Sequence, residues 1–395
     1  MTIESTNPPI VRRRIRLGMV GGGQGAFIGG VHRIAARLDD RYELMAGALS
    51  SDPARARASA AELHIAPDRS YADYLVMAKT EAARPDGIDV VAIVTPNHLH
   101  APIATAFLDA GTHVICDKPM TTTLAEAMAL VQRVRHTGCL FALTHNYSGY
   151  PMVRQARAMA ATGELGDIRI IQAEYPQDWL STDLEAAFQK QAAWRVDPAQ
   201  AGAGGSLGDI GTHAEHLARF ISGLELSEVS ADLSTFVQGR RLDDNAHVML
   251  RYSSGARGML WSSQVAPGNE NSLKVRVYGS KAGIEFRQEH PNQLWFTPLG
   301  KAPRLMTRAG AGAGPTATHA TRIPAGHPEG YLEAFAQLYS DVAEQLHARW
   351  EGGAPDPLAC TVPAVEDGAR GMKFIEAVVA SSQANGRWTD ASLKF

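Results

Sequence analysis

The segment GGSLGDIGTHAEH, residues 204–216, places three polar side chains at helical spacing directly after a run of glycines. Asp209, His213 and His216 stand four and three residues apart, so on a helix they share one face. A histidine near a carboxylate can accept the proton of a hydroxyl group, and the same three side chains could instead bind a metal ion. A structural alternative is that Asp209 caps the helix and His213 packs in a core.

The helix that carries these residues is expected to begin near Asp209 and to end at Gly223. The segment does not match HExxH, because Glu215 is out of phase with both histidines. We therefore expect no metal, and we expect Asp209 and His213 to handle a proton while His216 packs behind them.

A glycine-rich turn lies between a predicted strand and an amphipathic helix in RIRLGMVGGGQGAFIGGVHRIAARL, residues 14–38. Gly21 would allow the tight turn, and Gly23 would let backbone amides approach a pyrophosphate at the helix N-terminus. Gly29 would serve as the third glycine of the motif after an insertion around Gln24. This order of elements predicts dinucleotide binding.

The end of the second predicted strand, AGALSSDPARARA, gives conflicting signals about the cofactor. An acidic residue there would hold the ribose 2′-hydroxyl of NAD, whereas serine or arginine could hold the 2′-phosphate of NADP. Ser50 and Ser51 come first, Asp52 follows, and Arg55 lies further along the helix. Asp52 could equally be the N-cap of a helix that begins at Pro53. We expect NAD, with NADP left open.

Residues 1–146 alternate continuous apolar runs with helical patterns, which is typical of an α/β domain with a parallel sheet covered on both faces. The predicted strands are 15–20, 42–48, 90–95, 113–116 and 140–144, and the predicted helices include 52–63, 100–110 and 123–136.

Residues 147–395 favour an α+β domain with a mainly antiparallel sheet, because hairpin turns join consecutive short strands. A helix at 151–162 precedes a strand at 168–175, and two helices, at 331–349 and 362–385, close the chain. The Gly/Ala/Pro-rich segment 308–330 is expected to be either disordered or functional. Further strands are predicted at 229–237, 246–252, 258–264, 274–278, 283–286 and 293–296.

The composition also narrows the function. The chain has 395 residues, 45% of them hydrophobic, which is more than one ordinary core accommodates. Its formal charge is −3, without blocks of like charge, so neither a nucleic-acid nor a membrane partner is expected. The 3 cysteines are odd in number and far apart, and no signal or membrane-spanning segment is evident. A cytoplasmic protein is the expectation.

Residues 94–123, VTPNHLHAPIATAFLDAGTHVICDKPMTTT, resemble the signature of the Gfo/Idh/MocA oxidoreductases, the relatives of inositol dehydrogenase and glucose–fructose oxidoreductase. Two departures from the family pattern are the insertion in the glycine loop and Asp117, where many members have Glu. The resemblance extends through most of the chain and rests on the glycine loop with His32, Thr95-Pro96-Asn97 with His100, Asp117-Lys118-Pro119, Asn146 and the segment 204–216.

This resemblance implies a Rossmann domain followed by an open-faced antiparallel sheet, and NAD(P)-dependent oxidation of a hydroxyl on a sugar or cyclitol. It also implies catalytic roles for Lys118, Asp209 and His213, and a homo-oligomer, either a dimer or a tetramer. In that chemistry His213 would be the base, Asp209 would orient it, and Lys118 would polarise the same oxygen. A cis bond between Lys118 and Pro119 would fit the turn.

Other residues are candidates for contact with a substrate. Tryptophan beside polar residues suits a sugar, although core packing is an equally common role for each Trp. Tyr147 and Asn146 end the last Rossmann strand, where ligands bind in open α/β sheets. His319 and His327, in segment 308–330, could close over the site in this or a neighbouring subunit, but we expect them to be solvated. The other substrate candidates are Asp178, Trp179, Trp194 and Arg195.

Two alternative functions remain at this point. One is a glycoside hydrolase of the same architecture that uses NAD transiently, and the other is a non-catalytic subunit that senses a dinucleotide. The presence of Lys118, Asp209 and His213 together argues against the sensing subunit. The hydrolase would release sugar without accumulation of NADH, so an assay of NADH separates it from a dehydrogenase.

Overall fold

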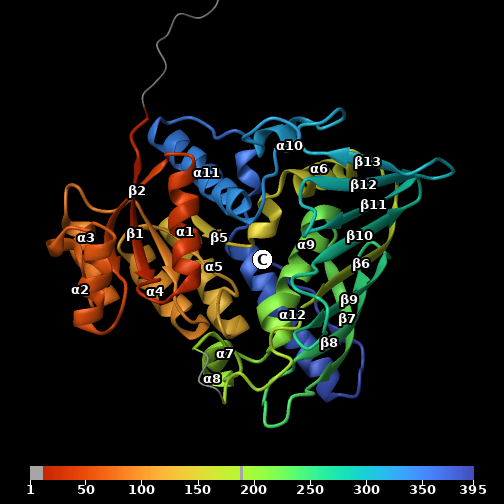
Figure 1. Ribbon diagram of the computed structural model, residues 1–395, viewed down its shortest axis with the longest axis horizontal. Coiled ribbons are helices and arrows are strands. Elements are labelled where there is room, and N and C mark those ends of the chain that lie inside the picture. The colour runs from red at the N-terminus through yellow and green to blue at the C-terminus, as the bar shows by residue number, and fades with distance from the viewer. Residues whose placement is uncertain (1–11, 187–189) are drawn as a thin grey trace, which may run out of the picture.

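The computed structural model describes residues 12–186 and 190–395, which form two sheets with helices between and around them (Figure 1). The first sheet is parallel and has the strand order β2-β1-β3-β4-β5. Every residue of β3 is buried, as expected for a strand covered on both faces. The predicted Rossmann domain is confirmed, and its strands are β1 (Ile15–Gly21), β2 (Tyr42–Ala48), β3 (Val90–Val94), β4 (His113–Cys116) and β5 (Phe141–Leu143).

Local signals fix the helices of this half. Thr123 and Glu126 form a capping box at the start of α5, which ends at Gly138 in the left-handed conformation, with φ of +65°. Asp73 caps α3, a helix that the sequence analysis did not anticipate. The helices are α1 (Phe27–Leu38), α2 (Pro53–Glu62), α3 (Tyr74–Ala83), α4 (His100–Asp109) and α5 (Leu124–Thr137).

The second sheet has nine strands in the order β13-β12-β11-β10-β6-β9-β8-β7-β14. Its neighbouring strands are antiparallel except for β6 and β9, which run parallel. The mainly antiparallel sheet is therefore confirmed. Its strands are β6 (Ile168–Pro176), β7 (Leu226–Ser234), β8 (Asn245–Tyr252), β9 (Arg257–Ser263), β10 (Lys274–Gly279), β11 (Ala282–Arg287), β12 (Gln293–Pro298), β13 (Arg304–Thr307) and β14 (Thr389–Asp390).

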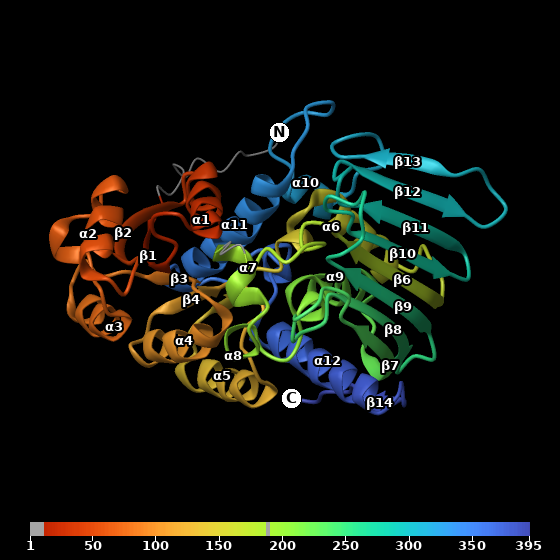
Figure 2. The ribbon, with the colours of Figure 1, turned by 60° about the horizontal axis from the view of Figure 1, so that its bottom comes forward.

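Helices cover one face of this sheet and leave the other bare, as Figure 2 shows. The covering helices are α6 (Pro151–Ala161), α9 (Thr212–Ser222) and α12 (Val365–Gln383), which lie between the two sheets. Burial alternates along β8 and β9, because one side of each strand faces these helices and the other side faces outward. We call the uncovered side the outer face.

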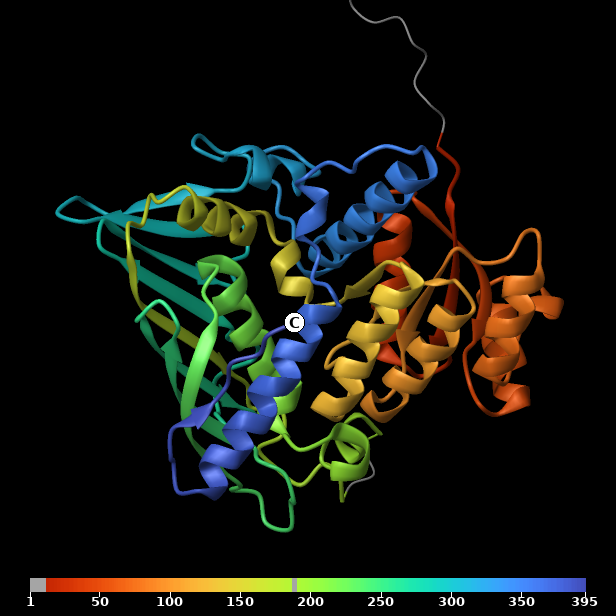
Figure 3. The ribbon, with the colours of Figure 1, turned by 180° about the vertical axis from the view of Figure 1, so that it is seen from behind.

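The two C-terminal helices pack back onto the Rossmann half. Figure 3 shows α11 (Tyr331–Trp350) and α12, both blue, beside the red-to-yellow half, where they contact α1 and α5 respectively. Phe335 and Leu346 of α11 belong to the same buried cluster as Ile15 of β1. The Tyr42 hydroxyl donates to the carbonyl oxygen of Tyr339 over 2.7 Å. The core therefore continues from one half of the chain into the other.

Segment 308–330 is ordered by its own buried arginine. The Arg308 guanidinium donates to the carbonyl oxygens of Ile323 and Pro324 at 2.6 and 3.0 Å and pairs with Glu329 at 2.9 Å. The segment contains a short helix, α10 (Pro315–His319), and Arg322 ties it to Asp39 at the end of α1. Of the two expectations for this segment, disorder is therefore wrong.

None of the helices in the described ranges is long and apolar enough to cross a membrane.

Candidate active site

A cavity of about 770 Å³ lies at the carboxyl ends of the Rossmann strands, where ligands bind in open α/β sheets. Its walls come from both halves of the chain: the glycine loop and the ends of β2 to β5 on one side, and β6, η4 (Leu207–Gly211) and α9 on the other. Predicted site residues that line it are Gly21, Gly23, Gln24, Ser50, Arg55, Thr95, Pro96, Asn97, Asp117, Lys118, Asn146, Tyr147, Trp179, Trp194, Arg195, Asp209 and His213.

The glycine loop fits a dinucleotide. Gly21 and Gly22 have φ of +81° and +72°, a region that favours glycine. A Cβ on Gly23 would fall 2.6 Å from the carbonyl oxygen of Leu49, and one on Gly29 would fall 2.4 Å from the Cα of Gly22. Helix α1 can therefore approach the loop closely. Its first turn has neither a side-chain cap nor an acidic residue, so the free amides suit a pyrophosphate.

Ser51, Asp52, His100 and Asp178, which the sequence also suggested, do not line the cavity. Asp52 caps α2, because its Oδ1 accepts from the Arg55 amide over 2.7 Å. His100 is buried, with its ring nitrogens 2.8 Å from the carbonyl oxygens of Pro119 and Thr95, so it fastens two loops of the site together. Asp178 accepts from the Gly268 amide over 3.2 Å.

Lys118 is held in place by its neighbours. The Lys118–Pro119 bond is cis, and the Lys118 amide donates to Oδ1 of Asp117 over 2.9 Å. The same Oδ1 accepts from the Thr144 hydroxyl over 2.8 Å. The Lys118 Nζ then reaches across the cavity and donates to the carbonyl oxygen and Oδ1 of Asp209, at 2.5 and 3.1 Å. This ion pair joins the two halves of the site.

Asp209 lies in the single π-helical turn η4, directly before α9, and not at an N-cap position. Its Oδ2 accepts from Arg195 Nε over 3.2 Å and from Gln264 Nε2 over 2.9 Å. Burial opposes ionisation of this carboxyl, but the charges of Lys118 and Arg195 outweigh burial and hold its pKa well below the usual range. Asp209 is thus an ionised group between two cations.

The hydrogen-bond partnership expected between Asp209 and His213 is not what the structure shows. Among the described residues, Asp209 is held by Lys118, Arg195 and Gln264, because these donors converge on its carboxylate. Asp209 acts on His213 through its charge alone, which favours the protonated form of the imidazole.

His213 lies in a cage of rings. Its ring centroid is 4.7 Å from that of Tyr147, 5.4 Å from that of His145 and 6.3 Å from that of Tyr175. Nδ1 is buried without a hydrogen-bond partner in the described part of the chain, and the residue lines the cavity, so Nε2 is the ring nitrogen that we assign to contact with a ligand. Burial, followed by the charge of Lys118, lowers the pKa of His213 well below its ordinary value. The imidazole is therefore neutral and able to accept a proton.

His216 packs behind the site. Its ring stacks on that of His145, with centroids 4.1 Å apart and planes 4° from parallel. Within the described residues, no group of three or more His, Cys, Asp or Glu side chains is arranged to hold a metal ion.

The substrate end of the cavity contains a chain of hydrogen bonds that the sequence analysis missed. The hydroxyls of Tyr147 and Tyr175 lie 2.5 Å apart, and Tyr175 donates to Oδ1 of Asn271 over 2.6 Å. Gln177 donates to the same Oδ1 over 2.6 Å, and Asn271 donates to Gln288 over 3.1 Å. These groups form a wall of amides and hydroxyls.

One signal in the sequence could have found part of this wall. Tyr175 lies near the end of β6, and Gln177 and Trp179 follow within four residues in the segment YPQDW. All three line the cavity, whereas Asp178 does not. The Trp179 Nε1 donates to Gln177 over 3.0 Å. Arg195 lies over the ring of Trp194, 4.3 Å from its centroid. Asn271 and Gln288 come from loops between strands, where no local pattern marks them.

The two histidines of segment 308–330 do not line the cavity. His319 Nε2 lies 3.0 Å from Oδ1 of Asp341, and the backbone oxygen of His327 accepts from Arg308.

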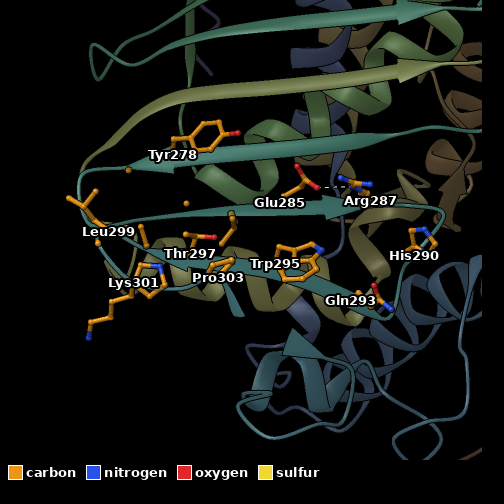
Figure 4. Close-up of a pocket in the computed structure, with 16 residues that line it drawn as sticks. Tyr278, Glu285, Arg287, His290, Gln293, Trp295, Thr297, Leu299, Lys301 and Pro303 are labelled. Atoms are coloured by element: carbon orange, nitrogen blue, oxygen red, sulfur yellow. Dashed lines mark hydrogen bonds and ion pairs between the residues drawn. The ribbon is translucent and has the colours of Figure 1, made fainter. Parts of the chain in front are cut away.

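A second hollow, of about 790 Å³, lies on the outer face of the large sheet (Figure 4). Tyr278 of β10 and Trp295 and Thr297 of β12 line it, and Glu285 of β11, the strand between these two, pairs with Arg287 over 2.7 Å. This hollow is similar in size to the first. However, it lies on the side of the sheet away from the glycine loop and His213, so we place the active site in the first cavity.

Known proteins resemble the chain along nearly its whole length. The family model "Oxidoreductase family, NAD-binding Rossmann fold" matches residues 15–145, and the model "GFO/IDH/MocA C-terminal domain" matches residues 153–285.

Three relatives illustrate the similarity. The structure of an oxidoreductase from Sinorhizobium meliloti is 55% identical, with a TM-score of 0.86, over 95% of this chain and 99% of that one. An inositol dehydrogenase homologue from Azotobacter vinelandii, complexed with NADH and myo-inositol, is 38% identical, with a TM-score of 0.88, over 96% and 98%. Levoglucosan dehydrogenase of Pseudarthrobacter phenanthrenivorans is 31% identical over 310 residues, which are 71% of this chain and 76% of that protein.

Proposed function

Because this chain belongs to the GFO/IDH/MocA family of NAD-binding oxidoreductases, we propose that it oxidises a secondary hydroxyl of a cyclic polyol or sugar to a ketone or lactone. The observation that carries the proposal is a neutral His213 that faces the same cavity as the glycine loop and the Lys118–Asp209 pair. A hydride acceptor site, a base and a fixed cation are what alcohol oxidation requires.

His213 is the proposed base. Its Nε2 accepts the proton of the substrate hydroxyl, and the imidazolium that results is stabilised by the ionised Asp209 nearby. The glycine loop would hold NAD, which would supply the hydride acceptor for the carbon that bears this hydroxyl.

Lys118 is the proposed electrostatic partner. Asp209 and the Asp117-Thr144 contacts fix its position, and its ammonium group has three donors, not all of which Asp209 can occupy. A donor aimed at the substrate oxygen stabilises the negative charge that develops as the proton leaves.

The walls of the cavity favour a neutral, polyhydroxylated ring. Trp179 and Trp194 offer apolar ring surface to the cavity. The side-chain amides of Gln177, Asn271 and Gln288 offer hydrogen-bond donors and acceptors. The relatives named for myo-inositol and levoglucosan support the same class of substrate.

The test is a panel of inositols, pyranoses and anhydrosugars incubated with the purified protein and NAD, with NADH formation followed by absorbance. We expect one or more cyclic polyols to give turnover, and His213→Ala to lower kcat by about 10²–10⁴-fold because the base is lost. His247→Ala is the matched control, since His247 stacks on Trp261, in a strand whose outward side chains face away from the cavity.

Three results would contradict all or part of the proposal. If glycosides released sugar without accumulation of NADH, the protein would be a hydrolase. If NADH bound but no member of the panel reacted, a sensing subunit would be the better description. Near-native kcat in His213→Ala would remove His213 as the base.

We also propose that the protein is a homo-oligomer, a dimer or a tetramer, joined through the outer face. This face exposes Met249 (54%), Ile170 (47%) and Met259 (44%), and beside them it carries charges of both signs in the pairs Arg276–Glu174 and Arg251–Glu228. A second copy offers the complementary surface. Light scattering should give a native mass of two or four chains, and Met249→Asp should lower it. A native mass equal to that of one chain would contradict the proposal.

A further inference from the structure

Among the described residues, none with an acidic side chain lines the end of the cavity at the carboxyl end of β2. Leu49, Ser50 and Arg55 are the residues of this region that line it. The only carboxylates among the described lining residues are Asp117 and Asp209, and both belong to the substrate end. This matters because a carboxylate at the end of β2 is what holds the ribose hydroxyls of NAD and repels a 2′-phosphate.

Asp52, the acidic residue nearest in sequence to this end of the cavity, has a structural role instead. It caps α2 through the Arg55 amide, and it does not line the cavity. The sequence left two roles open for Asp52, and the geometry favours the cap. Glu62, at the other end of α2, accepts from the Gln24 side chain.

Ser50 and Arg55 supply the chemistry that a phosphate requires. The Ser50 Oγ accepts from the Asp52 amide over 3.2 Å, so its hydroxyl hydrogen remains available. Arg55 is exposed, and in the described part of the chain no carboxylate pairs with its guanidinium. A guanidinium and a hydroxyl that both face the cavity can bind phosphate oxygens by charge-assisted hydrogen bonds.

We propose that the adenosine end of this cavity accepts a 2′-phosphate, so that the protein binds NADP as well as NAD, and that Arg55 determines the preference between them. This inference rests on the cofactor cavity and not on the proposed polyol substrate. Nucleotide binding without any polyol therefore tests it separately.

The experiment is a titration of the full-length protein with NADPH and, separately, NADH, followed by nicotinamide fluorescence. In the native protein we expect the two dissociation constants to agree within about tenfold. Arg55→Ala should weaken NADPH at least about tenfold more than NADH, because charge-assisted hydrogen bonds to the phosphate are lost. The cap of α2 survives this change, since Asp52 bonds the backbone amide of residue 55 and not its side chain.

Two further variants complete the test. Ser50→Asp places a carboxylate in the cavity and should weaken NADPH at least about a hundredfold while NADH still binds. Arg57→Ala removes an exposed arginine of the same helix that does not line the cavity, and it should leave both constants unchanged. Raising the salt concentration should weaken NADPH more than NADH in the native protein.

The proposal is overturned if native protein binds NADPH more than about a hundredfold more weakly than NADH. It is also overturned if Arg55→Ala weakens both nucleotides equally, since Arg55 would then contact the adenine or pyrophosphate common to both. Neither result would affect the proposed oxidation of a polyol with NAD.

Discussion

Single charges govern the chemistry of this site. The Asp209 carboxylate lies between Lys118 and Arg195, so it stays ionised and keeps the lysine ammonium fixed in the cavity. The same ammonium, added to burial, keeps His213 neutral. In the proposed mechanism this one cation has two roles. It keeps His213 neutral, so that the imidazole can accept a proton, and it stabilises the negative charge on the substrate oxygen that loses the proton.

The first prediction concerns the pH dependence of kcat/KM, which reports groups of the free enzyme. Because burial and Lys118 lower the pKa of His213, the base is lost only at a pH well below its ordinary value of 6.5. Lys118→Met removes the neighbouring positive charge, so the pKa of His213 should rise and the acid limb should move to higher pH. Arg33→Met removes a cation that is not among the causes of the His213 shift, and it should leave the limb in place. If the acid limb stayed at the same pH in Lys118→Met, the charge of Lys118 would not control the pKa of His213.

The element that presents the site is the turn formed by η4 together with α9. Asp243, from the loop before β8, accepts from the amides of Gly205 and Leu207 over 2.7 and 2.8 Å, and its carbonyl oxygen accepts from Ser206 over 2.8 Å. Three consecutive amides are thus tied to one residue. Asp209 and His213 follow within the next two turns, so their positions depend on this attachment.

The glycines of this segment are not equivalent, which gives the second prediction. A Cβ on Gly205 would lie 2.1 Å from the carbonyl oxygen of Asp243, whereas one on Gly208 meets no atom within 4 Å. Gly205→Ala should therefore lower the free energy of unfolding by about 1–3 kcal/mol. Gly208→Ala should change it little or raise it by about 0.4–1 kcal/mol. Urea denaturation followed by circular dichroism measures both, and equal effects would show that Asp243 does not constrain the segment.

At the scale of the whole molecule, α11 holds the two halves together. Its apolar face packs into the Rossmann core, and its Asp341 forms an ion pair with Arg154 of α6, in which both side chains are buried. Asp341 also accepts from Gln337 over 2.8 Å. The cavity between the halves is therefore bounded by a continuous core rather than by a hinge.

The third prediction compares this buried pair with an exposed pair in the Rossmann half. Asp341→Asn leaves the buried Arg154 without a counter-charge and should lower the free energy of unfolding by about 3–5 kcal/mol. Asp109→Asn breaks the exposed pair between Asp109 of α4 and Arg133 of α5 and should change it by about 0–1 kcal/mol. If the two variants unfold at the same urea concentration, the contact between α6 and α11 does not contribute to the stability of the fold.

Much of the fold could be predicted because it depends on local pattern. The apolar run 42–48 coincides with β2, and Gly223 ends α9 in the left-handed conformation, with φ of +69°. Glycine spacing marked the nucleotide loop, and the Asp-Lys-Pro and Asp-x3-His motifs marked residues that meet in one cavity. The boundary between the two domains, predicted between residues 146 and 147, stays a prediction.

The sequence by itself therefore determined which elements form and which residue types are available for proton transfer, because periodicity and motifs are properties of neighbouring residues. Only the tertiary structure decided the partners. The Asp209 carboxylate accepts hydrogen bonds from Lys118, Arg195 and Gln264 rather than from His213. Asp52 caps a helix. The tertiary structure also brought Asn271 and Gln288 to the substrate wall. Such contacts join residues far apart in the chain, and their geometry is set by the packing of whole helices and sheets.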